Sequence, residues 1–594
     1  MGSGHWIRRI LGFIQILQIL GSFQTIHGMV PQSPVQCDQS GCTLYNSYGA
    51  WGDRKDCSAL NVTYPTTEEQ LRLAVSYAVQ NKLKAKVVTK FSHTIPKLAC
   101  PQGNNNNINN NNIGNGNATL LISTEKYDSG IEIDGANLAV TADAGVGLRQ
   151  LIDAVEDAGF SLVAAPYWEG VTIGGLISTG GHGTSWWGKG GAVYDHVLGI
   201  SIVVPASKSE GYAKILRLDA QDPLLNAAKV SLGVLGAISK VKLSLEHRFK
   251  RSITYNFTND TYIEDVYIDH AKQYEFADIT WYPSRHTAVY RYDSRVPISV
   301  SGDGVNDFIG FQAIPNLIPE SVRAAEKLLE STRNAIGKCL TATTTLEFKK
   351  LVGNGLKNNG LIFTGYPVVG YQGKMQTSGS CLYSTKMHIT CAWDPRIKGL
   401  FFYESTAIFP ASKFGDFIRD VKKLRDLNPE KFCGIDNYNG MLIRFIKASN
   451  AYLGQSEDSV VIDFNYYRAR EPSTPRLNQD VWEEVEQLAF FKYGAKPHWA
   501  KNRNVAFLGV QHKYPKFNMF IAAKQQLDPK NVFSSEWSDD ILYGRESEKF
   551  DGCALEGLCI CSEDRHCSPD KGYYCSHGLV YKEARVCRCS APSV

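Results

Sequence analysis

The sequence predicts an α+β protein built from several parts, because three regions carry different patterns. Residues up to about 245 alternate between helix-like and strand-like segments, and residues 246–495 contain strands with alternating apolar positions. The end of the chain is rich in cysteine. With 594 residues, 43% hydrophobic and 21% charged, the composition is globular, which excludes collagen, coiled coil and a wholly disordered chain. The net charge of +4 gives no basis for predicting a nucleic-acid partner.

The first 28 residues have the pattern of a signal peptide. Arg8 and Arg9 precede an apolar run at 10–20, which two glutamines interrupt and which is too short to span a bilayer. We expect cleavage near Gly28 and entry into the secretory pathway, with a retained amphipathic anchor as the alternative. No other stretch is long and apolar enough for a transmembrane segment, so none is predicted.

The cysteines gather at the two ends of the mature chain. The N-terminal segment 29–57 holds Cys37, Cys42 and Cys57, and the tail 551–594 holds seven of the 15 cysteines. In an oxidising compartment such a tail is held by disulfides, each contributing roughly 2–4 kcal/mol. Zinc is the alternative, although the tail contains no Cys-x-x-Cys pair. We expect the tail to share no core with the rest of the chain and to be dispensable for catalysis.

A helix followed by a strand opens the region 58–245. Thr66-Thr67-Glu68-Glu69 can cap a helix, and 85–88 is a short apolar strand. His93 follows directly, at the kind of strand end where α/β sheets bind ligands, although a surface loop histidine is the alternative. Residues 104–117 contain ten asparagines and predict a disordered surface loop.

The strongest local signal is the segment 171–185, which packs five glycines, several hydroxyls and one histidine into 15 residues. Glycines let a ligand approach backbone N–H groups, which suits a pyrophosphate. The segment matches neither a Walker loop nor a Gly-x-Gly-x-x-Gly fingerprint. A glycine-rich turn in a packed sheet is the alternative.

Residues 246–495 predict an antiparallel sheet covered by helices. Stretches 277–282 and 460–466 read as strands, and 321–335, 411–425 and 480–492 read as amphipathic helices.

These motifs, taken in order, resemble the vanillyl-alcohol oxidase flavoprotein family, in its sugar-lactone oxidase branch. The resemblance rests on Pro65-Thr66-Thr67-Glu68-Glu69-Gln70, the histidine after 87–88, the glycines at 174–183, and Lys496-Pro497-His498-Trp499-Ala500-Lys501. It covers the chain from about residue 37 onward. It implies a two-part FAD-binding domain at 58–245 and an antiparallel-sheet substrate cap at 246–540, whose end at about 496–540 returns to the flavin.

The resemblance assigns cofactor roles residue by residue. His93 matches the histidine that bonds covalently to FAD, although the usual Gly-Gly-Gly-His-Ser is here Thr89-Lys90-Phe91-Ser92-His93-Thr94. The residues that match the loop contacting the FAD pyrophosphate are Gly174, Gly175, Ser178, Thr179, Gly180 and His182.

The resemblance also names catalytic residues. Arg444 matches the arginine of a Glu-x-Arg motif near the flavin, but the glutamate of that motif falls on Leu442. His498 and Lys501 match residues that approach the polar edge of the flavin ring, where a cation stabilises the reduced form. With Leu442 in place of a carboxylate, we expect a more apolar site and slow turnover, which Leu442→Glu would raise.

The implied reaction is FAD-dependent oxidation of an aldonolactone, in the first place L-gulono-1,4-lactone to L-ascorbate, with dioxygen accepting the electrons and giving hydrogen peroxide. Pro166 falls where the family screens the flavin from dioxygen, and proline there favours an oxidase. The expected destination is the apoplast or the vacuole, and sequons at Asn61, Asn117, Asn256 and Asn259 are compatible with glycosylation. The alternatives are a flavin oxidase of another sugar or polyol, and a non-enzymatic secreted glycoprotein.

Overall fold

The computed structural model describes residues 33–44, 57–91, 96–101, 119–378, 386, 388–391, 402–469, 471–545 and 549–590. The predicted signal peptide, His93 and the asparagine-rich loop 104–117 lie outside these residues. Within them, no helix combines the length and the apolar character that crossing a membrane requires.

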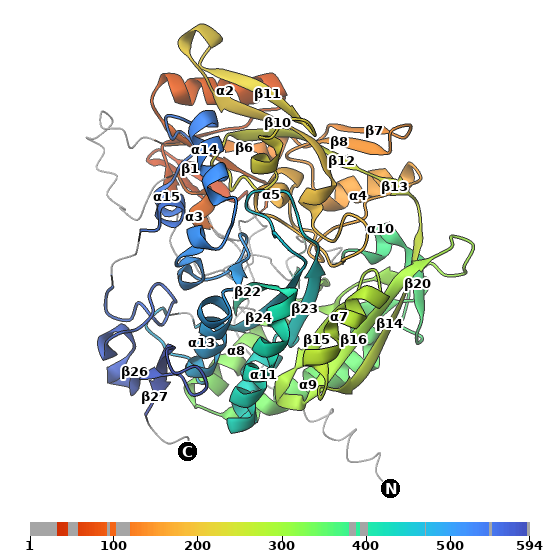
Figure 1. The fold of residues 1–594 in the computed structure, drawn as a ribbon, viewed down its shortest axis with the longest axis vertical. Coiled ribbons are helices and arrows are strands. Elements are labelled where there is room, and N and C mark those ends of the chain that lie inside the picture. Colours follow the sequence, from red (N-terminus) through yellow and green to blue (C-terminus); the bar gives the residue numbers. More distant parts are fainter. Residues whose placement is uncertain are drawn as a thin grey trace.

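The main sheets of the first part are one of three parallel strands and one of five antiparallel strands (Figure 1), and a further antiparallel sheet of β1 (Val35–Asp38), β2 (Gly41–Leu44) and β3 (Cys57–Ala59) precedes them. Helix α2 (Glu68–Gln80) begins where the sequence predicted, because the Thr67 side chain accepts a hydrogen bond from the N–H of Gln70. The three-stranded sheet is parallel and contains β4 (Asn61–Thr63), β6 (Thr119–Ser123) and β5 (Lys84–Val88). The five-stranded sheet is antiparallel and contains β11 (Ala213–Asp219), β10 (Val197–Pro205), β12 (Ala237–Ser244), β8 (Ala139–Asp143) and β7 (Ile131–Asp134).

The second part is one large antiparallel sheet. Its eight strands lie in the order β20 (Val368–Tyr371), β14 (Lys250–Asn259), β16 (Thr287–Val296), β15 (Asp278–Tyr282), β23 (Met441–Ile446), β24 (Ser459–Tyr467), β22 (Phe402–Pro410) and β25 (Lys496–Pro497). The boundary between the two parts falls between β12 and β14, next to the residue 245 that the sequence indicated.

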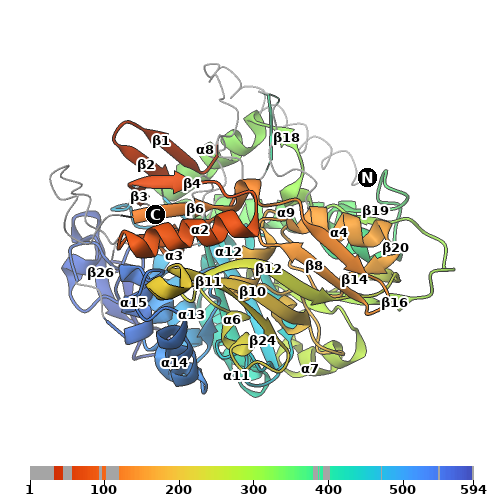
Figure 2. The same cartoon turned by 90° about the horizontal axis from the view of Figure 1, so that it is seen from above.

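Helices cover one face of the large sheet (Figures 1 and 2). Three of them are α7 (Ile263–Gln273), α11 (Ala411–Leu427) and α13 (Gln479–Gln487). Their apolar side chains form one core with strand residues of that face, among them Ile279, Ile443, Phe445, Ile462 and Phe464. Because successive strand residues point to opposite faces, the residues that alternate with these five along their own strands face away from the three helices.

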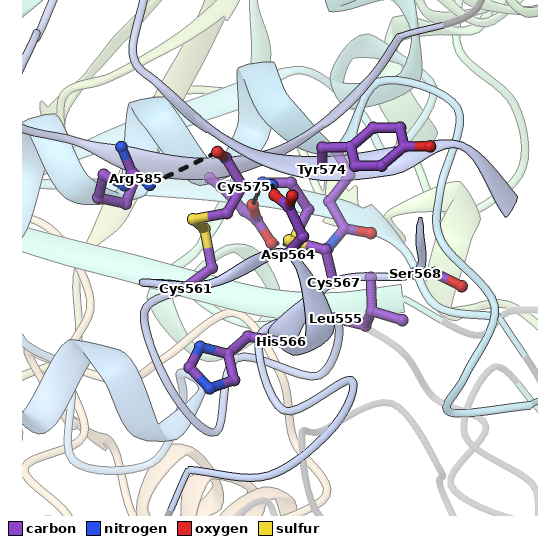
Figure 3. The surroundings of a disulfide bond; sticks show 12 residues. Leu555, Cys561, Asp564, His566, Cys567, Ser568, Tyr574, Cys575 and Arg585 are labelled. Carbon is purple, nitrogen blue, oxygen red and sulfur yellow. Dashed lines mark hydrogen bonds between the residues drawn. A yellow bond between two sulfur atoms is a disulfide. The ribbon is translucent and has the colours of Figure 1, made fainter. Parts of the chain in front are cut away.

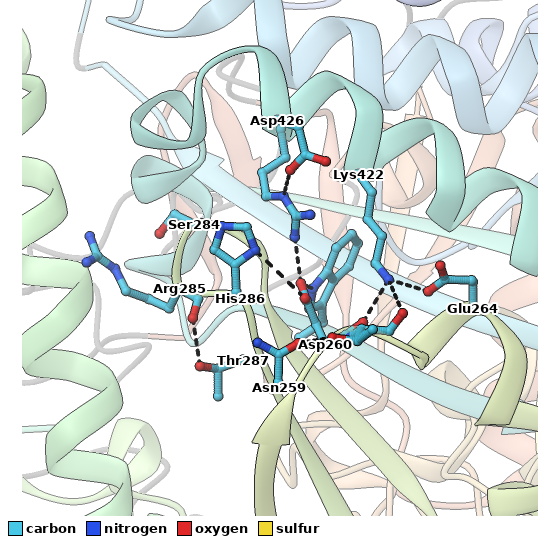
Figure 4. A network of polar contacts seen from close by, with 12 residues as sticks. Asn259, Asp260, Glu264, Ser284, Arg285, His286, Thr287, Lys422 and Asp426 are labelled. Atoms are coloured by element: carbon cyan, nitrogen blue, oxygen red, sulfur yellow. Dashed lines mark hydrogen bonds and ion pairs between the residues drawn. The ribbon is translucent and has the colours of Figure 1, made fainter.

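The predicted helices of the second part are confirmed, with shifted bounds. The segment near 321–335 is α8 (Leu317–Ser331) followed by a separate α9 (Ala335–Val352), and α13 runs into a further helical turn at 488–492. Asp260 fixes α11 to the end of β14 (Figure 4). Its carboxylate pairs with Arg425 at 2.6 Å and accepts the indole N–H of Trp281 at 2.7 Å.

The chain returns to the first part after β25. Helix α14 (Phe517–Leu527) contributes to the core of the five-stranded sheet, and Val532 and Phe533 pack against α2 and the parallel sheet. Residues from about 507 to 542 therefore complete the cores that the first part begins.

The cysteine-rich tail contains three disulfides, as the sequence predicted: Cys553–Cys559, Cys561–Cys575 and Cys567–Cys587. Figure 3 shows the second of these, with Arg585 donating a hydrogen bond to the Cys575 carbonyl. Because these six sulfurs are bonded to one another, they are not thiolate ligands for zinc. The N-terminal disulfides are Cys37–Cys42 and Cys57–Cys100.

The expectation that the tail shares no core with the rest of the chain is wrong. Leu579, Val580 and Tyr581 pack against the core under the large sheet, and their backbone N–H groups donate to the Glu484 carboxylate at 2.6–2.8 Å. Glu483 accepts the N–H of Cys587 at 2.8 Å. The tail therefore docks on α13 through hydrogen bonds to the buried carboxylates of Glu483 and Glu484. A search for apolar residues in the tail does not detect such contacts.

Candidate active site

A cavity of about 540 Å³ lies between the glycine-rich segment and the face of the large sheet opposite α7, α11 and α13. The first part of the chain contributes Thr89, Phe91, Pro166, Tyr167, Gly175, Thr179, Gly181 and His182. The second part contributes Asp278, Thr280, Arg291, Lys349, Glu404, Leu442, Arg444, Asp463, His498 and Lys501. Strand parity explains the strand residues of the second set, since Leu442 and Arg444 alternate along β23 with the core residues Ile443 and Phe445.

The glycine-rich segment forms the short helix α5 (Ile173–Ser178) and the loop after it. Of the six residues predicted there to bind the cofactor, Gly175, Thr179 and His182 line the cavity. A Cβ on Gly175 would lie 3.4 Å from the Thr172 hydroxyl. Packing therefore does not require glycine here, and the absence of a side chain keeps this part of the cavity wall clear.

The other three predicted cofactor residues are absent from the cavity lining, and each has a local role. The N–H of Gly174 donates to Ala144, and a Cβ at this position would approach the Ala144 side chain to 2.9 Å. The Ser178 hydroxyl donates back to the Gly174 carbonyl at 2.7 Å. Gly180 has a φ of +68°, which favours glycine. Packing and turn geometry thus account for glycines that the motif alone attributes to phosphate contact.

Two neutral imidazoles stand together on the wall, with ring centroids 5.0 Å apart. Nδ1 of His182 lies 2.8 Å from the Gly183 carbonyl and donates to it, which leaves Nε2 as a buried acceptor without a partner among the described residues. Burial, reinforced by Arg444, lowers the pKa of His182 to about 3. Nδ1 of His498 accepts the N–H of Ala500 at 3.0 Å, and burial together with His182 holds its pKa well below the usual range.

Asp463 is the centre of the charged network in the cavity. Its two oxygens pair with Arg444 at 2.6 Å and Lys501 at 2.9 Å, and Thr406 also donates to it. Lys501 pairs in addition with Glu404 at 2.6 Å. Burial alone would raise the pKa of Asp463, but the two cations outweigh it and hold the pKa far below its usual range. Asp463 is therefore a fixed anion that holds both predicted cations in place.

The expectation of a more apolar site, drawn from Leu442, does not account for Asp463, whose carboxylate pairs with Arg444. Leu442 lies opposite Asp463 in the register of β23 and β24, and both side chains line the cavity. The carboxylate missing from position 442 is thus present on the neighbouring strand. The alternation of Asp463 and Asn465 with apolar residues in 460–466 was the available sequence signal, but only the strand register shows what it faces.

The residues present fit a bound FAD. The open wall at Gly175 and the unpartnered Nε2 of His182 are the features that a buried ligand would complete. His93 itself is not described, but Thr89 and Phe91, which precede it, line the cavity. Pro166 also lines the cavity.

Comparison with known proteins supports this interpretation. A family described as "FAD binding domain" matches residues 59–208, "D-arabinono-1,4-lactone oxidase" matches 402–541, and "L-gulonolactone oxidase 2-like, C-terminal domain" matches 550–589. The chain is 65% identical to L-gulonolactone oxidase 3 of Arabidopsis thaliana, over 98% of each chain. It is 24% identical to L-gulonolactone oxidase of Bos taurus, over 83% of this chain and 97% of the bovine one.

Solved structures support the fold. A solvent-stable cholesterol oxidase superposes with a TM-score of 0.62 at 15% identity, over 82% of this chain and 96% of its own. The predicted architecture, a two-part FAD-binding domain of the vanillyl-alcohol oxidase type with an antiparallel-sheet cap, is confirmed.

Proposed function

The chain belongs to the L-gulonolactone oxidase family of FAD-dependent oxidoreductases, and from that premise we propose that it oxidises an aldono-1,4-lactone. The favoured substrate is L-gulono-1,4-lactone, oxidised at the carbinol carbon beside the carbonyl. The resulting 2-keto lactone enolises to L-ascorbate. Dioxygen takes up the two electrons and two protons and becomes hydrogen peroxide. The observation that carries this proposal is the Arg444–Asp463–Lys501 network, which faces the cavity next to two neutral histidines.

The side chains divide the work of this reaction. FAD, when bound, supplies the hydride acceptor. Arg444 and Lys501 are positioned to donate hydrogen bonds to oxygens where negative charge develops, and Asp463 keeps both cations from turning away. Asp463 is too weak a base to take the hydroxyl proton, because its pKa lies far below the usual range. Nε2 of His182 is an open hydrogen-bond acceptor that orients the substrate hydroxyl, and with its pKa lowered to about 3 it is likewise too weak a base to keep the proton.

We further propose that FAD is attached covalently through His93, and that the chain enters the secretory pathway for the apoplast or the vacuole. The disulfides in the tail and at the N-terminus support an oxidising destination. Acid precipitation should leave yellow colour in the wild-type pellet and release it from His93→Ala. Free flavin in the wild-type supernatant would refute the linkage but not flavin binding.

The test of function uses the purified full chain. We expect flavin absorption, and oxygen uptake matched by peroxide release on L-gulono-1,4-lactone. Oxygen uptake with alditols but not with lactones would replace the proposal with a polyol oxidase. A colourless protein would favour a binding glycoprotein and contradict both enzyme proposals.

A further inference from the structure

A second polar group lies on the same cavity wall, separate from Arg444 and Lys501. Asp278 and Thr280 alternate along β15 with the core residues Ile279 and Trp281, so strand parity points them into the cavity. Arg291 of β16 is the register partner of Asp278. Lys349 of α9 completes the group, and its ammonium lies 3.2 Å from the Thr280 hydroxyl.

These side chains are buried, yet they keep unused hydrogen-bonding capacity. Asp278 is 2% exposed and Arg291 is 1% exposed. The Oδ1 atom of Asp278 and the Nη2 group of Arg291 have no hydrogen-bond partner among the described residues. Buried polar atoms left in this way cost free energy unless a ligand or water completes them.

Lys349 adds donors that the protein does not neutralise. Lys349 is 4% exposed, and no carboxylate of the described residues lies within ion-pair distance of it. The neighbouring charges are balanced, because Arg251 and Arg291 face Asp293 and Asp278. The ammonium of Lys349 is therefore an extra set of donors at the cavity wall.

Tyr167 connects this group to the proposed reaction site. Its hydroxyl donates to Asp278 at 2.5 Å, and its ring lies 5.4 Å from the Arg291 guanidinium and 5.8 Å from that of Arg444. A ligand held by Arg444 could therefore extend along Tyr167 towards Asp278 and Lys349. The cavity thus offers polar contacts at two places rather than one.

We propose that Asp278, Arg291 and Lys349 form a subsite for the hydroxyl-bearing side chain of the lactone, remote from the carbon that is oxidised. A hydroxyl both donates and accepts, so a vicinal diol fits one free acceptor, Oδ1 of Asp278, beside free donors on Arg291 and Lys349. This proposal rests on the proposed lactone oxidation. It identifies the hydroxyl-bearing side chain as the part of the substrate by which the protein distinguishes one lactone from another.

The test compares two substrates on the full-length flavoprotein. One is L-gulono-1,4-lactone, and the other is the tetrono-1,4-lactone with the same configuration at C2 and C3, which lacks the exocyclic diol. For Lys349→Met and Asp278→Asn we expect kcat/KM on the gulonolactone to fall about 10- to 100-fold, as for loss of a hydrogen bond to a charged group. On the tetronolactone we expect a change of less than about 2-fold.

Lys350→Met is the matched control, because Lys350 is the next residue of α9 and pairs with Glu347 on the surface. We expect it to leave both substrates unchanged. Flavin content measured for each variant separates misfolding from a binding defect, and Lys349→Met decides the question if Asp278→Asn fails to fold.

Equal losses on both lactones, or no loss on either, would overturn the subsite while leaving lactone oxidation in place. Wild-type protein that turns over neither lactone would overturn the proposed function and the subsite with it.

Discussion

Asp463 in the cavity and Glu483 at the tail interface are both buried carboxylates, but their surroundings push their pKa values in opposite directions. Asp463 touches two cations, Arg444 and Lys501, and its pKa is held far below the usual range. Glu483 accepts hydrogen bonds from the Cys587 N–H and the Gln479 amide. Burial raises its pKa to about 7, and the Arg503 charge and the Cys587 N–H offset this only in part.

The difference shows that the partner, not burial, decides the charge of a buried acid. Cations in direct contact keep Asp463 ionised, so it can fix the positions of two charged side chains. Arg503 is already paired with Glu486, so Glu483 shares a cation that another carboxylate occupies. The ion pairs of Asp463 therefore keep its carboxylate charged in the cavity. Glu483 at the tail interface, in contrast, gains or loses a proton near neutral pH.

The largest expected effect comes from removing the charge of Asp463. Asp463→Asn should lower kcat/KM for the lactone about 100-fold or more, because Arg444 and Lys501 each lose a charge-assisted hydrogen bond. Steady-state turnover at matched flavin content measures it. Asp416→Asn, an exposed residue of α11 paired with Arg419, is the control and should keep wild-type turnover. Wild-type activity in Asp463→Asn would contradict the positioning role.

Removing the tail tests how much the interface at Glu483 and Glu484 contributes to stability. A stop after Leu542 takes away the N–H groups that satisfy Glu483 and Glu484 and exposes part of the core under the large sheet. We expect the free energy of unfolding to fall by about 3 kcal/mol or more, while flavin remains bound. Thermal unfolding with flavin fluorescence checks both. An unchanged melting temperature would mean that the tail docks without stabilising α13.

Glu483→Gln should change how stability depends on pH. Since the folded pKa of Glu483 is raised to about 7, the stability it contributes is fully present below its unfolded pKa and is lost as pH rises through 7. The variant should therefore gain stability relative to wild type between pH 5 and pH 8, by on the order of 1–3 kcal/mol. Urea unfolding of both proteins across that range measures the difference, and parallel curves would refute the assignment.

The smallest effect is expected from Leu442→Glu. The sequence alone favoured a gain in rate, but the register places this position opposite Asp463, where a second carboxylate would be repelled. We now expect turnover to fall about 3- to 10-fold with flavin retained, a cost of about 1 kcal/mol. Leu442→Met is the matched control of similar volume. A faster Leu442→Glu enzyme would show that Arg444 prefers the carboxylate on its own strand.

Local patterns predicted much of the fold and part of the site. The cap at Thr67, the alternation in 277–282 and 460–466, and the clustered cysteines are each effects of neighbouring residues, so a linear reading detects them. The order of the motifs then indicated FAD and placed Arg444, His498 and Lys501 together, and all three line the cavity. Of the six glycine-loop residues assigned to the cofactor, three line the cavity, and the other three have local roles in packing, a hydrogen bond and a turn.

By itself, the sequence determined which elements form and which residue types gather near the flavin, because helix caps, strand alternation and motif order depend on short-range spacing. Only the tertiary structure decided which charges meet. Asp463 lies opposite Leu442 on the neighbouring strand, and Asp278 accepts a hydrogen bond from Tyr167, which lies 111 positions earlier in the sequence. The tail, which appeared independent, donates its backbone to Glu484 of α13. Such pairings are set by strand register and by packing between distant segments, and no local pattern encodes them.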